Sequence, residues 1–184
     1  MVERAELIGQ RASSVELERV TFRGTALSGT ELESSRLTDV RFEQCDLSGF
    51  VLLDCSLVRV VLDECRVAGF AVSRGSAVGL EVRSCRGEGA AFFCVEARDL
   101  VVEDCQLDEP DFRELRLAGG RIERCRLTGA DFGAARVADL RVAECVLERL
   151  GGAGGLSGAT VDVGSLLSMA PGLAAALGIT VTAD

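Results

Sequence analysis

Charged and apolar residues along this chain follow a period of five. The 47 charged side chains of residues 1–150 avoid every multiple of five and every position two past one. Chance would produce this with odds on the order of one in ten billion. The period matches neither the 3.6 residues of an amphipathic helix nor the 2 of a half-buried strand. The pattern therefore predicts a repeat array that turns a corner every five residues.

The two charge-free slots differ in size. Of the 29 positions taken in steps of five from Leu7 to Leu147, 25 hold Leu, Phe, Val or Ile. Two residues before most of these positions the chain carries a smaller residue, mostly Val, Cys or Ala. We expect both slots to point inward and the other three to face solvent.

A second period of twenty lies on the first. Phe22 and Phe42 fall in one column, whereas Phe92, Phe112 and Phe132 fall in another. Cysteines spaced by twenty form a ladder of six, namely Cys45, Cys65, Cys85, Cys105, Cys125 and Cys145. Four five-residue edges then make a square coil, and stacked coils lie ~4.8 Å apart if backbone hydrogen bonds join them. The prediction is an all-β repeat, a quadrilateral parallel β-helix of about seven coils and roughly 35 Å in length.

Individual repeats resemble a known family. Residues 45–49 read Cys-Asp-Leu-Ser-Gly and residues 130–134 read Ala-Asp-Phe-Gly-Ala. Both are similar to the consensus of pentapeptide-repeat proteins, and the resemblance covers about four-fifths of the chain. It implies that the coil is right-handed, and we assign residues 1–150 to this domain.

The register breaks after residue 150, so residues 151–184 are predicted to form a separate C-terminal segment. Gly151 to Gly155 is expected to be a flexible linker. Residues 163–181 lack charge, but Pro171-Gly172 and the absence of a basic flank argue against a membrane span. We expect instead two short helices, the first capped by Asp162 and the second beginning at Pro171, followed by a short strand at residues 179–181.

The C-terminal helices have two possible roles, which are to cover the last coil and to pair with a second copy. We favour a homodimer, because the apolar stripes exceed what one coil end requires. The candidate dimer interface consists of Val163, Leu166, Leu167, Leu173, Leu177 and Ile179.

The C-terminal segment also resembles the MfpA-type pentapeptide-repeat proteins. The matching stretch is Gly-Ala-Thr-Val-Asp-Val at 158–163, followed by an Ala-rich helix ending at Gly178. The resemblance implies a dimer that binds DNA gyrase by mimicking the shape and charge of B-DNA. It also implies fluoroquinolone resistance or protection of the topoisomerase from its poisons. The projecting loops of Qnr-type relatives have no counterpart here.

Charge gives this implication mixed support. The formal net charge is −9, which favours a basic protein partner over direct binding of nucleic acid. However, residues 113–149 carry eight Arg and six acidic residues, so the C-terminal coils are mildly basic. The candidate partner-binding acidic patch consists of Asp63, Glu64, Glu103, Asp104, Asp108, Glu109 and Asp111. The alternative is a solvated face neutralised by neighbouring arginines.

A second candidate surface is apolar. Val51, Leu53 and Phe93 occupy outward slots on one face and form a candidate docking column. The alternative is that Arg side chains cover these residues. This column supports a second hypothesis for the function, a protein-interaction scaffold whose partner is unrelated to topoisomerases.

The cysteines and the acids do not point to catalysis. Seven of the eight cysteines lie in the inward small slot, whereas Cys94 lies outward. The chain has no His and no Cys-x-x-Cys pair, so we expect no metal and no cofactor. A convex rod offers no cleft in which an acid could become a general base, so we expect no enzyme activity. The N-terminus has no signal-peptide pattern, which predicts a cytoplasmic protein with no membrane attachment.

Overall fold

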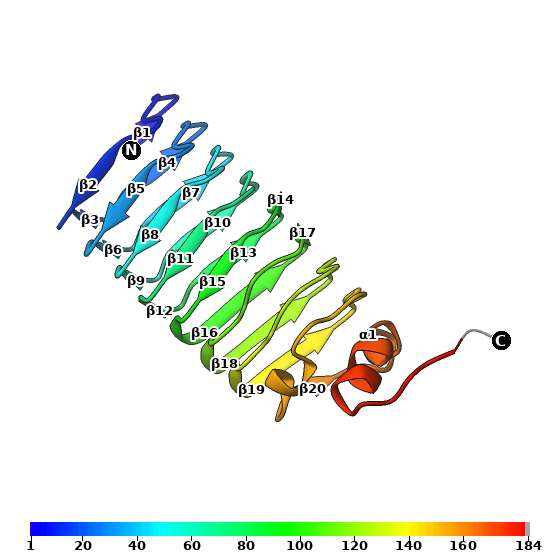
Figure 1. The fold of residues 1–184 in the computed structure, drawn as a ribbon. Helices are drawn as coiled ribbons and strands as arrows, with labels where there is room; N and C mark the ends of the chain where they lie inside the picture. The colour runs from blue at the N-terminus through cyan, green and yellow to red at the C-terminus, as the bar shows by residue number, and fades with distance from the viewer. Residues whose placement is uncertain (183–184) are drawn as a thin grey trace.

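The computed structural model describes residues 1–182 as a single rod with a helix at its C-terminal end (Figure 1). The rod is a parallel β-solenoid of about eight turns, which confirms the predicted fold class. The core is one continuous column of apolar side chains along the rod axis.

Each corner of the coil is made by one residue in the left-handed conformation. All thirty residues in steps of five from Arg4 to Arg149 have φ between 49° and 76°. Nine of the thirty are glycines, and none is Val, Ile or Thr, for which a positive φ is most strained. The quarter-turn at every fifth residue is therefore a backbone event that recurs without interruption.

The short strands between corners stack into flat faces (Figure 1). Two of the faces belong to a 13-stranded sheet, which contains β1 (Val2–Glu3), β3 (Glu16–Glu18), β4 (Thr21–Arg23), β6 (Arg36–Thr38), β7 (Arg41–Glu43), β9 (Ser56–Val58), β10 (Val61–Asp63), β12 (Ser76–Val78), β13 (Glu81–Arg83), β16 (Glu96–Glu103), β18 (Arg116–Glu123), β19 (Arg136–Ala143) and β20 (Thr160–Val161). The third face is a five-stranded sheet of β2 (Arg11–Ser13), β5 (Glu31–Glu33), β8 (Val51–Leu53), β11 (Ala71–Ser73) and β15 (Ala91–Phe93). The fourth face contains β14 (Arg86–Glu88) and β17 (Gln106–Asp108), together with isolated bridges.

All pairings are parallel, and through residue 143 each joins residues twenty apart. Leu62, for example, lies between Phe42 and Val82. The predicted twenty-residue period is thus the register of the sheets. It places like side chains above one another.

The phenylalanine columns are confirmed, and they are joined into one. The rings of Phe22 and Phe42 stack with centroids 5.1 Å apart, and those of Phe112 and Phe132 stack at 4.8 Å. Phe50 and Phe70 connect the two columns by tilted or edge contacts, at 6.0 to 6.2 Å between successive rings. Both lie in the slot predicted to be small, and both are 1% exposed.

The C-terminal segment differs from the prediction of two helices. A single helix, α1 (Val163–Ala176), runs through Pro171. Pro171 has no backbone N–H, so it cannot donate the helical hydrogen bond to the carbonyl of Leu167. Leu167 is 70% exposed, so this carbonyl lies on the solvent side of the helix, where water satisfies it. Residues 179–181 form no strand.

The Gly-rich stretch is part of the folded rod, in contrast to the expected flexible linker. Ala153–Leu156 forms a short 3-10 helix in which Ala153 and Leu156 are buried. The chain then returns to the coil through β20, where Thr160 pairs with Arg141 and Val161 with Val142. The boundary at residue 150 remains a prediction.

Helix α1 covers the last coil by replacing the carbonyls that a further coil would supply. The Asp162 carboxylate accepts the backbone N–H of Glu144 at 2.9 Å. The hydroxyl of Ser165 accepts the N–H of Cys145 at 2.8 Å, and that of Ser168 accepts the N–H of Leu147 at 3.0 Å. Three polar side chains thus accept hydrogen bonds from N–H groups of the last coil, whose edge would otherwise be open to pairing with a strand of another chain.

The phenylalanine column leads to a first prediction. Phe112 is 0% exposed and stacks on rings on both sides, so Phe112→Ala should lower the free energy of unfolding by about 3–5 kcal/mol. The half-buried Phe93, on the outer surface of the next lower coil, provides the control. Phe93→Ala should cost much less in a urea denaturation series. Equal losses would contradict a core built on stacked rings.

The cap leads to a second prediction, on pH. Hydrogen bonds from Ser165 and Glu144 lower the pKa of Asp162 in the folded protein. The carboxylate therefore stabilises the cap above the pKa of an unfolded Asp, about 3.9, and this contribution is lost as the pH falls through the lower folded value. Asp162→Ala should reduce the melting temperature at pH 7, and the difference from wild type should shrink below pH 4. The exposed Glu148, which does not lie at a corner, is the control for replacement of a carboxylate by Ala, and a pH-independent difference for Asp162→Ala would contradict the role of the carboxylate.

Candidate functional site

The acidic residues singled out from the sequence do not form one patch. Asp63 and Glu103 lie on the same face two coils apart, with Arg83 paired between them. Asp108 belongs to β17 on the next face, and Asp111 pairs with Ala91 on the face after that. The seven predicted residues therefore extend around three sides of the rod.

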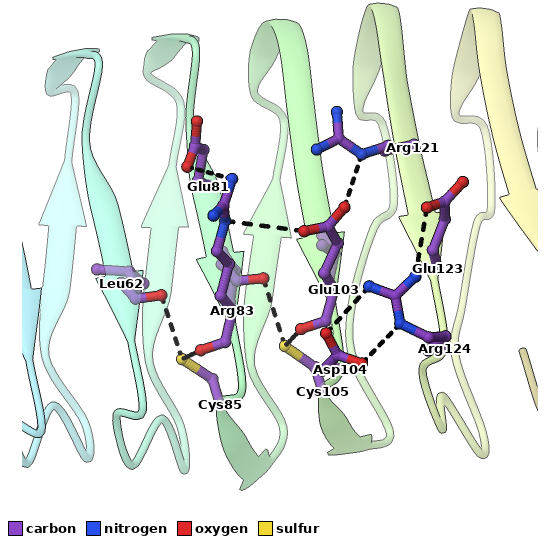
Figure 2. Close-up of polar contacts among 12 residues, drawn as sticks. Leu62, Glu81, Arg83, Cys85, Glu103, Asp104, Cys105, Arg121, Glu123 and Arg124 are labelled. Atoms are coloured by element: carbon purple, nitrogen blue, oxygen red, sulfur yellow. Dashed lines mark hydrogen bonds and ion pairs between the residues drawn. The ribbon is translucent and has the colours of Figure 1, made fainter.

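Arginines neutralise the centre of this region (Figure 2). The Glu103 side chain is 15% exposed and accepts a hydrogen bond from Nε of Arg121 at 2.7 Å. Nε of Arg83 lies 3.8 Å from Glu103, while Nη2 of Arg83 contacts Glu81 at 2.9 Å. Glu103 is thus held between arginines of the coils below and above it.

The neighbouring carboxylates are paired in the same way. Arg124 donates two hydrogen bonds to Asp104, at 2.8 and 3.0 Å, which lower the pKa of that carboxyl and raise the pKa of Arg124 (Figure 2). Arg113 donates to Asp111 through its backbone N–H and its guanidinium. Burial alone would raise the pKa of Asp111, but these hydrogen bonds lower it. The remaining predicted acids of this stretch, Asp108 and Glu109, contact Arg126 at 3.3 Å and Arg149 at 3.8 Å.

Asp63 and Glu64 differ from the rest of the predicted patch. Neither forms an ion pair among the residues that the structure describes, and Glu64 accepts a hydrogen bond from the neutral side chain of Gln44 at 2.8 Å. These two carboxylates keep their negative charge uncompensated at the surface. An Arg one coil away, at 18 or 20 residues, pairs Glu103 and Asp104, and Glu64 has none at that spacing. Asp63 does have Arg83 twenty residues on, but that guanidinium contacts Glu81 and Glu103 instead, so sequence spacing alone does not separate Asp63 from the paired acids.

Charged groups that form no ion pair are distributed along the rod differently from charged residues as a whole. Within residues 1–182, ion pairs engage fourteen arginines and thirteen carboxylates, leaving fifteen carboxylates and six arginines outside any pair. In residues 113–149 most arginines reach back to acids of an earlier coil. There the uncompensated groups are Arg136 and the carboxylates Glu114, Asp131, Asp139, Glu144 and Glu148. The C-terminal coils, predicted to be mildly basic from their composition, therefore present mainly negative uncompensated groups.

The apolar docking column lies on the five-stranded face, as predicted. Val51, Leu53 and Phe93 are half-buried, and Ser73 pairs between Leu53 and Phe93. The alternative, that Arg side chains cover these residues, applies to Phe93: the guanidinium of Arg113 lies 5.6 Å from the centroid of its ring. Whether a partner docks here stays a prediction.

The candidate dimer residues lie mostly on the outer side of α1. Val163, Leu167 and Leu177 are 73%, 70% and 77% exposed. Leu166 and Ile179 are also exposed, whereas Leu173 packs against the core. Met169 and Ser165 are the buried contacts that attach the helix to the rod. The sequence pattern left open whether the helices cover the last coil or pair with a second copy, and it did not single out Ser165 or Met169 as contacts to the rod.

The cysteine ladder is part of the core. All six ladder thiols and Cys55 are buried, and Cys94 is half-buried. Each ladder thiol donates to backbone carbonyls, as Cys85 does to Arg83 at 3.2 Å and to Leu62 at 3.6 Å (Figure 2). Burial raises the pKa of Cys55, and the hydrogen bond with Cys125 together with burial raises the pKa of Cys145, which keeps these thiols protonated. Among residues 1–182 no three His, Cys, Asp or Glu side chains are arranged to hold a metal ion.

One surface depression, of about 560 Å³, lies between α1 and the Gly-rich stretch and is lined by Gly, Ala and Leu150. A second, of about 320 Å³, contains Cys94 beside Glu96, Glu114, Arg116 and Arg136. Of the helices described, none is both long and apolar enough to cross a membrane.

Comparison with known proteins agrees with the repeat. A family profile described as "Pentapeptide repeat region" matches residues 15–92. No curated protein sequence matches the chain. The structure of full-length QnrB1, a plasmid-mediated fluoroquinolone resistance protein, is 18% identical over 96% of this chain and 99% of its own, with a TM-score of 0.45.

A second similar structure is HetL from the cyanobacterium Nostoc, a pentapeptide repeat protein involved in heterocyst differentiation regulation. It is 15% identical over 86% of this chain and 92% of its own, with a TM-score of 0.28. The five-residue period and the square coil agree with the matched profile, so residues 15–92 form a pentapeptide-repeat region.

Proposed function

We propose that this protein is a non-catalytic binding rod that presents an acidic surface to a basic, nucleic-acid-binding protein, with DNA gyrase as the partner. The observation that carries the proposal is the balance of uncompensated charge, fifteen carboxylates against six arginines in residues 1–182. A groove that normally receives DNA attracts such a surface, which in turn repels nucleic acid.

The shape of the rod supports this proposal. Eight coils at ~4.8 Å give a length of roughly 38 Å, without an inserted loop in the repeat. Residues 1–150 carry 27 acidic residues and 20 arginines, a net charge of −7, which over that length corresponds to about one charge per 5 Å, compared with one per ~1.7 Å in duplex DNA. The rod is a weaker polyanion than DNA, so its binding to the groove falls less steeply with salt than that of DNA, and it competes with DNA better as the salt concentration rises. Protection of gyrase from fluoroquinolones is the consequence that we propose for such competition.

Charge reversal tests the proposal. Replacing the uncompensated pair by Asp63→Lys and Glu64→Lys should raise about tenfold the concentration that half-inhibits DNA supercoiling by purified gyrase. The control is the exchange of Asp104→Arg with Arg124→Asp, which preserves both the ion pair and the net charge, and should leave the inhibition unchanged. The assay is repeated with a fluoroquinolone and at two salt concentrations. No effect of the wild-type protein on gyrase at a large molar excess would exclude the proposal.

We further propose that the rod acts as a homodimer joined through α1. The outer side of the helix exposes Val163, Leu166 and Leu167 next to one another, on an element that has already satisfied the last coil with its other side. A second copy that covers this side would bury these leucines and double the length of the acidic surface.

One substitution tests the dimer. Leu167→Glu should convert a dimer to a monomer in sedimentation equilibrium, because it places two carboxylates in the proposed interface. Ile8→Glu is the matched control, since Ile8 is also an exposed apolar residue, 52% exposed, at the opposite end of the rod. A wild-type monomer at high micromolar concentration, or a dimer that survives Leu167→Glu, would contradict this assembly.

A further inference from the structure

One face of the rod is free of charge at its centre. The outward positions of β8, β11 and β15 form what we call the central face, which consists of Val51, Leu53, Ala71, Ser73, Ala91 and Phe93. The three strands lie side by side in the five-stranded sheet (Figure 1). In a chain with 27% charged residues, six neighbouring outward positions without a charge interrupt the acidic surface.

The central face has relief that matches a helix. Leu53 and Phe93 occupy equivalent positions two coils apart, hence ~10 Å along the rod, with the smaller Ser73 between them. Ala71 and Ala91 leave a low surface beside them. In an α-helix parallel to the rod, residues i and i+7 are ~10.5 Å apart. The side chain at i+3 or i+4 would then enter the hollow at Ala71 and Ser73.

Carboxylates border both ends of the central face. Toward the N-terminus, Glu31 is paired with Arg11, whereas Glu33 forms no ion pair among residues 1–182. Toward the C-terminus, Asp111 is paired with Arg113, whereas Asp131 accepts only the backbone N–H of Gly133. Glu33 and Asp131 are about five coils apart, or ~24 Å, which is the length of a helix of about sixteen residues.

From this relief and charge we propose that the central face binds an amphipathic α-helix of a partner protein. The helix carries an apolar stripe at i, i+3 or i+4, and i+7, with Lys or Arg at both ends. Its apolar side chains cover Leu53 and displace the Arg113 guanidinium, which lies 5.6 Å from the centroid of the Phe93 ring, to reach Phe93. Its basic ends reach Glu33 and Asp131. This site is separate from the uncompensated Asp63 and Glu64, so the rod can engage two partners at once.

A second copy of this chain fits the central face poorly. Helix α1 offers an apolar stripe at Val163, Leu167 and Ala170, but the chain has no basic residue after Arg149. The N-terminal end of α1 carries Asp162, which would approach carboxylates at either end of the face. Charge therefore selects a basic partner helix over self-association.

The test uses the full-length protein and a labelled 18-residue peptide. The peptide has a Leu stripe at i, i+3, i+4 and i+7 with two Lys at each end, and a matched peptide replaces each Lys with Glu. Fluorescence anisotropy should show binding of the Lys peptide by the wild-type protein. Leu53→Asp and Phe93→Asp should each weaken that binding at least tenfold, and Glu33→Lys several-fold.

The control is Val78→Asp, which places the same charge at an exposed apolar position on β12, on a different face. It should bind the Lys peptide within twofold of wild type. Circular dichroism confirms that each variant is folded, and Glu33→Lys tests the proposal by itself if an apolar variant does not fold. The proposal is overturned if no peptide binds, if the Glu peptide binds as tightly as the Lys peptide, or if Val78→Asp weakens binding as much as Leu53→Asp does.

Discussion

The structure depends on a left-handed residue at every fifth position. A non-glycine residue in this conformation costs about 1–2 kcal/mol, and 21 of the thirty corners are not glycine. Most corners also provide an N–H that bonds the following coil, as Asp104 does to the carbonyl of Glu123 at 3.1 Å. The strain of one corner is therefore offset only when a neighbouring coil is in place. The coils must form together, and the fold has no stable unit smaller than several turns.

This constraint explains how much of the fold follows from the sequence. Because the register never slips, the spacing of apolar residues predicts the inward slots, and the spacing of the cysteines predicts the stacking. The same argument failed for Phe50 and Phe70, which occupy a slot assumed to be small. Periodicity reports which side chains point inward, but the distribution of volume between two facing slots depends on packing within each coil.

The candidate sites were harder to predict, because they depend on distances between coils. The acidic residues at 103–111 read as one cluster along the chain, yet a corner separates Asp108 from Glu103. Arginines of the adjoining coils neutralise Glu103 and Asp104. The prediction of two helices failed for a related reason. Pro171 is tolerated inside α1 because the helix rests on the last coil through its other side, which no local pattern reveals.

The side-chain cap at the end of the rod has a consequence for the growth of such proteins. Asp162, Ser165 and Ser168 imitate the carbonyls of a coil, so the cap fits any coil whose N–H groups have the same positions. An ancestral chain could gain or lose twenty residues at a time and retain its terminus. A deletion of one residue would rotate every later side chain out of its column. The length of the rod can consequently change only by whole coils of twenty residues, and duplication of a coil is the natural route to such a change.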